Sequence, residues 1–397
     1  MRSYSKMSIK CSLCSGSCQE ILDLGEQNLA NNLSNNQSEI YNTFKLSLVI
    51  CKKCGIQQLD GIVDPTIMFQ NYLWVTGTSE TTLSYLERLA LFCNNYKGVN
   101  ARVLEIASND GSFLECMVKH GWSVKGVDPA RNIADLANSK GIETIPSFFG
   151  STYLDKYPAE IGNYDLVVAR NVIPHAPNVK EILTSARKLL DADGKLLAEF
   201  HDANQLYDDG QIDYIYHEHK YYFTYNSFVN LAAEHGYRVT DYKRSPISAG
   251  SHVIVFEKAD DIGEVKKVGL VELARYANGG LQKVCDRFTR SVKKIIDSHQ
   301  GNIIGFGASA RASTLLNLLD DDSAKKIRVI LDNSTHKNGF YFSRHRILIE
   351  KPDSIFSLNK DFVVLVFAWN FFNEIEEQLI ESGVQPSRII NIKRFLY

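Results

Sequence analysis

The sequence predicts a three-part α/β protein: a central Rossmann-like domain, a small metal-binding domain before it and a second small α/β domain after it. Two observations lead to this prediction. Two pairs of closely spaced cysteines lie in the first 54 residues, and buried-strand patterns alternate with helical patterns in the middle and again in the last third of the chain. We place the domains at residues 1–75, 76–260 and 261–397.

The composition is that of an ordinary globular chain. Its 397 residues are enough for two or three domains that each bury a core. With Lys+Arg 44 and Asp+Glu 46, the net charge of -2 does not favour a nucleic-acid or membrane partner. No apolar run reaches the roughly 18 residues that span a bilayer, and the start of the chain lacks the apolar stretch of a signal peptide. We therefore expect a cytoplasmic, monomeric protein.

The cysteine pairs predict a structural zinc site. The expected ligands are Cys11, Cys14, Cys51 and Cys54. Each CxxC turn lets two thiolates face one ion, and two turns complete a tetrahedral shell. Gly16 and Gly55 permit the tight backbone, a strand is predicted over residues 44–50, and Cys18 is expected to be a bystander. A redox pair and a catalytic zinc are the alternatives, although four thiolates leave no open position for a substrate.

The next stretch joins the first two domains. Tyr72 and Trp74 stand among several hydroxyl side chains, ahead of a helix predicted over residues 83–96. They either seal the junction or wall an active site, and both alternatives stay open.

The middle of the chain alternates between strand and helix patterns. Strands are predicted over residues 101–106, 122–127, 142–145, 164–170 and 195–200, the last after an Asp193-Gly194 turn. Helices are predicted over residues 112–120, 132–140, 179–190 and 227–235, and a hairpin over 237–242 and 251–257. This alternation implies a parallel sheet with its ligand at the carboxyl ends of the strands. The hairpin would complete a seven-stranded sheet whose last strand is antiparallel.

The loop after the first of these strands indicates the ligand. A dinucleotide loop uses three glycines so that a pyrophosphate can approach, whereas this loop has Asn109 and Asp110 before a single Gly111, and Glu105 at the strand end. Carboxylates repel phosphate but suit a cationic ligand that carries an amino acid. Asp128, at the end of the second strand, is placed to accept ribose hydroxyls. This layout indicates S-adenosylmethionine, and an ordinary Asp-Gly turn is the alternative.

A second cluster of titratable side chains follows the fifth strand. The stretch Tyr214-Ile-Tyr-His-Glu-His219 holds two histidines, a glutamate and two phenols, with Tyr222 close behind. In isolation it could be a solvated loop. Its position at the carboxyl edge of the sheet instead favours an active site that faces the methyl donor.

The last third repeats the strand, glycine-loop and helix pattern. A mostly helical stretch over residues 265–299 softens at Gly279-Gly280, and strands are predicted at 327–331, 362–367 and 389–392. Another strand begins at Asn302, and the loop that follows it is formed by Gly305, Gly307, Ala308 and Ser309, with Arg311 beyond it. Backbone amides at a helix start together with a guanidinium suit a diphosphate. A glycine turn without a ligand and a separate NAD site are the alternatives.

These motifs together resemble a known family. The CxxC pairs, the stretch Glu105-Ile-Ala-Ser-Asn-Asp-Gly111 and the stretch Tyr214–Phe223 are similar to those of the sugar C-methyltransferases of deoxysugar biosynthesis, over essentially the whole chain. The resemblance implies a class I methyltransferase fold, structural zinc and S-adenosylmethionine. It also implies methylation at carbon 3 of a 4-keto-6-deoxysugar linked to a nucleotide such as dTDP or GDP.

The resemblance also assigns residues. The expected catalytic residues are His219 as the base, with Tyr216 and Glu218 in support, Glu218 fixing the imidazole tautomer or orientation. The expected donor-binding residues are Glu105, Ser108, Asn109, Asp110, Gly111, Asp128, Asn171 and His175. The expected substrate-binding residues are Tyr72, Trp74, Glu199, His201, Tyr214, Tyr222, Gly307, Ala308, Arg311, Lys337, Trp369 and Asn370. Asp202 is expected at the same strand end as Glu199 and His201, facing the active site. His217 receives no role.

Two departures from the family pattern affect sugar recognition. Ser248-Ala-Gly-Ser-His-Val253 replaces a motif that carries a histidine and an arginine, and Asn373 stands where an aspartate is usual. The competing functions are a sugar O-methyltransferase, a sugar-nucleotide epimerase or dehydratase, and a non-catalytic zinc scaffold that binds nucleotide sugars. An epimerase of this kind would need a full GxGxxG loop with a Tyr-x-x-x-Lys pair, a combination that the sequence does not contain.

Overall fold

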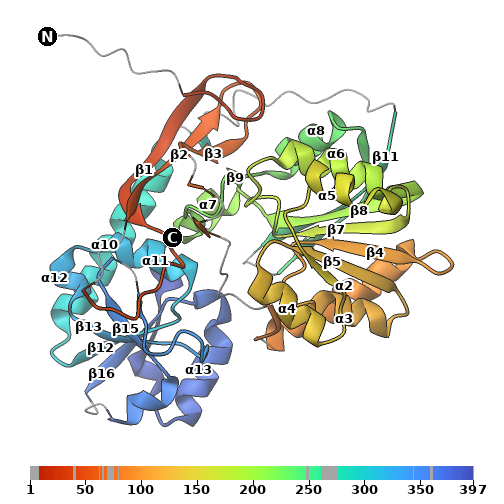
Figure 1. Cartoon of the computed structure of the whole chain (residues 1–397). Helices are drawn as coiled ribbons and strands as arrows, with labels where there is room; N and C mark the ends of the chain where they lie inside the picture. Colours follow the sequence, from red (N-terminus) through yellow and green to blue (C-terminus); the bar gives the residue numbers. More distant parts are fainter. Residues whose placement is uncertain are drawn as a thin grey trace, which may run out of the picture.

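The computed structural model describes residues 9–38, 42–61, 63–64, 67–68, 76–78, 80–246, 250–260, 275–276, 278–342, 344–357 and 361–396. These residues form three sheets of four, seven and six strands (Figure 1). Within the described part of the chain, no helix has both the length and the apolar character needed to cross a bilayer.

The N-terminal sheet is antiparallel and borrows its last strand from the middle of the chain. Its strands are β1 (Cys18–Asn28), β2 (Thr43–Cys51), β3 (Gln57–Leu59) and β9 (Tyr221–Tyr222), in that order. The strand expected over residues 44–50 is confirmed as β2. In β9, Tyr222 pairs with Gln57 and Tyr221 with Gln58. The titratable stretch that ends at His219 is therefore tied directly to the cysteine-bearing domain.

The middle sheet has the expected topology. Its order is β10-β11-β8-β7-β4-β5-β6, with every pairing parallel except those of β11, which runs antiparallel to β8 and β10. The strands are β4 (Arg102–Ile106), β5 (Ser123–Asp128), β6 (Thr144–Pro146), β7 (Tyr164–Arg170), β8 (Leu190–His201), β10 (Tyr237–Ser245) and β11 (Ser251–Lys258). This is the strand order of a class I methyltransferase, as predicted.

Helices cover both faces of this sheet. They are α2 (Glu80–Cys93), α3 (Ser112–Lys119), α4 (Arg131–Ser139), α5 (Ser151–Lys156), α6 (Val179–Leu189) and α8 (Tyr225–Ala233). In β7, Leu166 and Val168 belong to the core that includes α2 and α3, whereas Val167 and Ala169 belong to the core that includes α6 and α8. Burial on both faces explains why the strands read as continuous apolar runs.

One predicted turn is wrong. Asp193 and Gly194 lie within β8, which continues from Leu190 to His201. The pairing with β7 skips from Leu190 to Lys195, so the extra residues form a bulge rather than a turn. A Cβ atom on Gly194 would lie 2.7 Å from the carbonyl oxygen of Tyr164, which explains the glycine.

The C-terminal sheet is a second parallel sheet with one antiparallel edge strand. Its order is β14-β15-β13-β12-β16-β17, and β14 is antiparallel to β15. The strands are β12 (Asn302–Phe306), β13 (Ile327–Leu331), β14 (Tyr341–Phe342), β15 (Ile347–Glu350), β16 (Phe362–Val366) and β17 (Ile389–Asn391). The predicted strands are confirmed here, but Gly305, which was expected in the loop, lies within β12, and the short β14 and β15 were not predicted.

The helices of this third part include the interruption predicted at Gly279-Gly280. They are α10 (Gly280–Ser298), α11 (Ala310–Asn317), α12 (Asp321–Ala324) and α13 (Phe372–Glu381). Residues 275–276 are helical, and α10 begins at Gly280, just after Gly279, which takes a left-handed backbone with φ of 73°. Residues 265–274 lie outside the described residues.

The three parts meet around one shared core. Leu48 of β2, Ile215 of the titratable stretch and Leu315 of α11 belong to the same buried cluster. Figure 1 shows β9 and the short helix α7 (Gln205–Asp208) at this junction, between the red and blue parts of the chain. The limits predicted for the domains stay predictions, but the active-site segment lies where the domains contact one another.

Candidate active site

The four predicted cysteines come together as a metal site. Their sulfur atoms all lie within 4.8 Å of one another, with Sγ of Cys14 and Cys51 3.4 Å apart and Sγ of Cys11 and Cys54 3.8 Å apart. A tetrahedron with zinc–sulfur bonds of about 2.3 Å has edges of about 3.8 Å, so the spacing fits zinc. The residues fit a closed structural site and hold Zn²⁺ with no open position for a substrate.

The glycines beside the two CxxC turns permit the tight backbone, as expected, for two different reasons. Gly55 has a positive φ of 72°, which a side chain would disfavour. Gly16 is needed for space, because a Cβ atom there would lie 2.8 Å from the Cβ of Lys53 and 3.0 Å from the sulfur of Cys51. Both glycines thus hold the two CxxC turns close together.

The loop between β4 and α3 has a strained backbone that points its amides inward. Ala107, Asn109 and Gly111 have positive φ values of 56°, 51° and 77°. The amide of Asn109 donates to Oδ2 of Asp128 (2.9 Å), and Asn109 Oδ1 accepts from the amide of Thr76 (2.9 Å). The expected donor-binding acids therefore lie side by side at the carboxyl ends of β4 and β5.

Several buried oxygens in this region fit a cationic ligand. Oε2 of Glu105, Oγ of Ser108 and Oδ1 of Asn171 have no hydrogen-bond partner among the described residues. Buried acceptors without partners are costly, and an ammonium group would satisfy them. By contrast, Asp110 is already bound to Lys140 Nζ at 2.9 Å, so its role is to shape the loop.

A buried charge network that was not predicted supports this edge of the sheet. Arg170, at the end of β7, donates from Nη1 to Glu105 (3.1 Å) and from Nε to Glu199 (3.0 Å), and the hydroxyl of Tyr85 also donates to Glu199 (2.5 Å). Burial raises the pKa of Glu105 to about 8, although Arg170 opposes this rise. Glu199 was predicted to bind substrate; it is fully buried and serves as the counter-charge of Arg170 instead.

Arg170 could have been found from the sequence. It ends a strand whose other residues are mainly apolar, and a charged side chain in such a position needs a buried partner. The sequence does not show which residues are those partners, because Glu105 and Glu199 lie 65 and 29 positions away from Arg170.

The titratable stretch forms a cluster of rings around His219. Tyr214 stacks on His201 (ring centroids 3.7 Å apart, 19° between planes) and packs at a tilt against His219 (4.0 Å), which Tyr216 also contacts (4.0 Å). His175, from the loop after β7, meets His219 edge-on at 4.6 Å. The structure therefore brings together the predicted base, its predicted phenol partner and the loop expected near the donor.

The hydrogen bonds of His219 define which nitrogen is reactive. Its Nδ1 lies 2.8 Å from the carbonyl oxygen of Tyr214, which can only accept, so Nδ1 carries the proton and Nε2 keeps a lone pair. Burial, together with the nearby His175, lowers the pKa of His219 well below its usual value. The side chain is 1% exposed and stays neutral at neutral pH, in the form that a general base requires.

This pKa shift predicts the pH dependence of turnover. If His219 is the base, kcat/KM should stay flat as pH falls from 8 to about 6.5 and decline only at lower pH, because the neutral imidazole persists below the usual titration range of histidine. Initial rates across pH, with folding checked by circular dichroism at each point, test this. An acid limb at or above pH 6.5 would contradict it.

Folding should respond over the same pH range. Burial lowers the pKa of His201 to about 3, so the neutral form is the one that the fold favours. The contribution of neutral His201 to the stability of the fold is complete above about pH 6.5, the pKa of histidine in an unfolded chain. This contribution is lost as pH falls toward 3. Circular dichroism at each pH therefore shows whether a fall in rate comes from protonation of His219 or from unfolding.

The role assigned to Glu218 is corrected. The tautomer of His219 is fixed by the backbone of Tyr214, whereas Oε1 of Glu218 accepts from Nδ2 of Asn31 (2.5 Å) in the N-terminal domain. His217, which received no role, bonds through Nε2 to the carbonyl oxygen of Phe44 (3.1 Å). Both side chains therefore attach the motif to the zinc-bearing domain.

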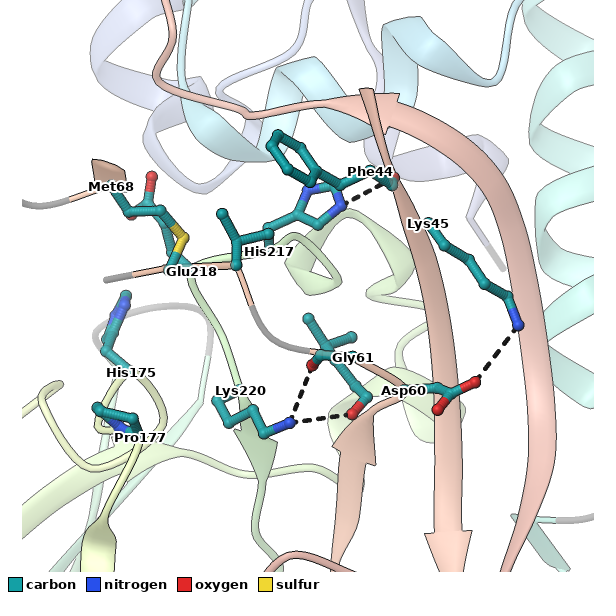
Figure 2. Close-up of a pocket in the computed structure, with 12 residues that line it drawn as sticks. Phe44, Lys45, Asp60, Gly61, Met68, His175, Pro177, His217, Glu218 and Lys220 are labelled. Carbon is teal, nitrogen blue, oxygen red and sulfur yellow. Dashed lines mark hydrogen bonds and ion pairs between the residues drawn. The ribbon is translucent and has the colours of Figure 1, made fainter. Parts of the chain in front are cut away.

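A pocket of about 150 Å³ lies between that domain and the motif (Figure 2). His175, His217 and Glu218 line one part of it, and Phe44 and Asp60 line another. Lys220, also unpredicted, donates to the carbonyl oxygens of Leu59 (3.3 Å) and Gly61 (2.9 Å), and burial lowers its pKa to about 8.

The glycine loop of the C-terminal domain is largely satisfied by its own side chains. The amide of Ala308 donates to Oδ2 of Asp332 (2.7 Å), and Lys337 Nζ bonds to Asp332 (3.3 Å) and to the carbonyl oxygen of Ala308 (2.8 Å). Gly307 is required because a Cβ atom there would lie 2.4 Å from that of Ala368. In the loop that was expected to bind a diphosphate, the carboxylate of Asp332 thus already accepts from the amide of Ala308 and from Lys337.

The remaining predicted residues fall into three groups. Trp369 is buried and Asn370 is exposed, while the departure Asn373 lies exposed at the start of α13. Tyr222 is buried in β9 beside His219, with ring centroids 6.2 Å apart. Tyr72 and Trp74 lie outside the described residues.

The other departure has a partial explanation. Residues 248 and 249 lie outside the described residues, but His252 Nε2 is 3.2 Å from Oδ1 of Asp202, and Arg244 Nη1 donates to Oδ2 of Asp202 (2.7 Å). The imidazole and the cation that the family motif supplies are therefore both present at the end of β8, from neighbouring positions in the hairpin.

Comparison with known families agrees with this architecture along most of the chain. Residues 11–69 match the model described as "Putative zinc binding domain", residues 80–242 match "Methyltransferase domain" and residues 259–391 match "C-methyltransferase C-terminal domain". The C-methyltransferase NovU of Streptomyces niveus is 29% identical over 384 residues, which cover 92% of this chain and 91% of that protein. A ubiquinone biosynthesis O-methyltransferase of Vibrio parahaemolyticus is 26% identical over 95 residues, 23% of this chain and 40% of that protein.

Solved structures also match parts of this chain. The magnesium protoporphyrin IX methyltransferase ChlM of Synechocystis has a TM-score of 0.33 at 14% identity, over 45% of this chain and 79% of that chain. The PH0226 protein of Pyrococcus horikoshii has a TM-score of 0.38 at 18% identity, over 50% of this chain and 100% of that chain.

The strand order and the acidic donor loop define a class I methyltransferase, which uses S-adenosylmethionine. The three matched domains narrow this class. Together with the likeness to NovU, they indicate a C-methyltransferase with an N-terminal zinc-binding domain.

Proposed function

We propose that the enzyme methylates carbon 3 of a nucleotide-linked 4-keto-6-deoxysugar. The observation that carries this proposal is the hydrogen bond from His219 Nδ1 to the carbonyl oxygen of Tyr214, which leaves Nε2 as a proton acceptor beside the loop that follows β7. A methylation at oxygen requires no cleavage of a C–H bond, whereas methylation at carbon requires a base for that step. The site contains such a base in its neutral form.

The chemistry follows from the acidity of a proton next to a ketone. In a 4-keto sugar, Nε2 of His219 takes the proton from carbon 3, and the electron pair spreads onto the carbonyl oxygen. The hydroxyl of Tyr216, whose ring lies 4.0 Å from that of His219, donates to this oxygen. S-adenosylmethionine, when bound, supplies the methyl group for carbon 3 and leaves as S-adenosylhomocysteine.

The binding residues are assigned by their position. For the donor we propose Glu105, Ser108, Asn109, Gly111, Asp128, Asn171 and His175, with Asp110 shaping the loop. For the sugar nucleotide we propose Tyr214, Tyr222 and the C-terminal loop with Gly307, Ala308, Lys337, Trp369 and Asn370, with dTDP or GDP as the nucleotide. We further propose that the enzyme works in the cytoplasm as a monomer.

The test is a panel of dTDP- and GDP-linked 4-keto-6-deoxysugars in heavy water. We expect the wild-type protein to exchange the proton at carbon 3 for deuterium without any methyl donor, and to add one methyl group at that carbon once S-adenosylmethionine is present. Mass spectrometry and NMR of the sugar measure both events. A product methylated at oxygen, with no exchange at carbon 3, would instead show an O-methyltransferase and refute the proposal.

A further inference from the structure

Helix α11 contacts the catalytic segment through the residues on one of its faces. Arg311 and Thr314 stand three positions apart, so their side chains share that face. Arg311 forms a two-point ion pair with Asp213, from Nε to Oδ2 (2.9 Å) and from Nη2 to Oδ1 (3.0 Å). Thr314 Oγ1 donates to the carbonyl oxygen of Ile215 (2.9 Å). Residues on both sides of Tyr214 are therefore held by α11.

The ion pair is buried and further supported. Arg311 is 8% exposed and Asp213 is 0% exposed, and the indole of Trp369 also donates to Asp213 Oδ2 (2.7 Å). Arg311 Nη2 also donates to Oε1 of Gln211 (3.1 Å), and this oxygen lies 2.9 Å from Nε2 of His201. A two-point guanidinium–carboxylate pair holds its partner in one geometry. Here it fixes Asp213 relative to the C-terminal domain.

These contacts converge on the residue that orients the base. The guanidinium carbon of Arg311 lies 5.5 Å from the centre of the Tyr214 ring, and His201 stacks on that ring at 3.7 Å. The carbonyl oxygen of Tyr214 in turn accepts the proton of His219 Nδ1. A movement of residues 213–215 would move this acceptor, and His219 could then adopt its other tautomer.

We propose that Arg311 is a positioning residue for His219, acting through Asp213 and the backbone of Tyr214, rather than a ligand of the substrate diphosphate. The inference rests on the proposed role of His219 as the base. Its consequence is that the C-terminal domain contributes to the chemical step as well as to binding.

The competing role for Arg311 makes a different prediction. Nη1 has no hydrogen-bond partner among the described residues, so a phosphate oxygen could reach it in principle. However, the charge of Arg311 is already balanced by Asp213, which weakens its attraction for an anion. If Arg311 binds the diphosphate, replacing it should weaken nucleotide affinity. If Arg311 positions His219, replacing it should change the histidine tautomer and the rate of the chemical step.

The first experiment reads the tautomer without any substrate. Proteins with ¹⁵N-labelled histidine are compared by NMR, and the His219 signals are assigned by their loss in His219→Asn. We expect one Nδ1-protonated form in the wild type and a mixture of tautomers in the double variant Arg311→Met/Asp213→Asn, which leaves no unpaired buried charge. Arg328→Met, which removes an exposed arginine that donates to Oδ1 of Asn302, should behave as wild type. An unchanged single tautomer in the double variant would overturn the inference.

The second experiment separates binding from chemistry. Arg311→Lys keeps the charge but loses the two-point geometry, and we expect kcat to fall by about 10²-fold with KM unchanged, since small displacements of a catalytic group have effects of this size. Thr314→Val, which removes the hydrogen bond to the carbonyl oxygen of Ile215, should have a smaller effect in the same direction. Affinities for dTDP and GDP alone are measured in parallel. A rise in KM or in these dissociation constants at unchanged kcat would assign Arg311 to the diphosphate and overturn the inference.

The two proposals fail in different ways. If no sugar nucleotide exchanges its proton, or His219→Asn keeps full turnover, the proposed function fails whatever Arg311 does. If His219 proves essential while its tautomer and the chemical step are indifferent to Arg311, only the positioning role fails.

Discussion

Replacing His219 with asparagine is expected to lower kcat by about 10²–10⁴-fold, which is the usual contribution of a positioned general base. The affinity for S-adenosylmethionine should stay at the wild-type value, because the donor-binding loop belongs to β4 and β5 and does not depend on the imidazole. Asparagine is the appropriate replacement, since its side-chain NH₂ can still donate to the carbonyl oxygen of Tyr214 while offering no basic nitrogen.

The matched control is His235→Asn. His235 also bonds through Nδ1 to a backbone carbonyl, that of Leu231 at 2.8 Å, but it follows α8 and lies outside the catalytic segment. Turnover measured as S-adenosylhomocysteine release, and donor affinity measured by calorimetry, should separate the two variants. If His219→Asn methylates at the wild-type rate, His219 is not the base. Deuterium exchange at carbon 3 should disappear in His219→Asn and persist in His235→Asn.

Loss of the zinc ion is expected to abolish turnover without unfolding the methyltransferase sheet. Binding of a structural zinc is worth about 10–16 kcal/mol in small domains, which is comparable with the entire stability of many folds. Cys51→Ser removes a buried ligand at the end of β2, so the N-terminal sheet should lose its order. That sheet includes β9, and the carbonyl oxygen of Phe44 in β2 bonds to His217, while Asn31, in the loop after β1, donates to Glu218.

The expected consequence is specific. The catalytic segment should lose its anchor while the donor site stays intact, so S-adenosylmethionine should still bind to a protein that no longer turns over. Cys18→Ser is the control, because Cys18 is a neighbouring thiol outside the four-sulfur cluster. Zinc content, donor affinity and rate are measured for both variants. Full activity in a zinc-free Cys51→Ser protein would show that the metal site and the catalytic segment are independent.

The fold could be predicted largely because its signals are local. Strands buried on both faces read as short apolar runs, and β7 and β13 were predicted to the residue. The bulge in β8 was missed because Asp-Gly is a turn signal, and only its pairing with β7 shows that the chain continues as a strand. β14 and β15 were missed because two to four residues give too little pattern to recognise.

The chemistry of the site was predicted for the same reason, but its contacts were not. The CxxC pairs, the acids of the donor loop and the cluster from Tyr214 to His219 show in the sequence which groups are present. Glu218 was assigned to orient His219 because it is adjacent in sequence, yet the backbone of Tyr214 does so. Arg311 was assigned to an anion because it follows a glycine loop, yet its charge meets Asp213.

By itself, the sequence determined that this protein would bind zinc, carry a class I methyltransferase sheet and use S-adenosylmethionine, because each of these features depends on residues close together in the chain. Only the tertiary structure decided how the three parts meet around the segment that contains His219. Asp213 and Arg311 stand 98 positions apart, and β9 completes a sheet whose other strands all end before residue 60. A buried charge must have a partner, but which partner it meets is decided by the packing of distant elements.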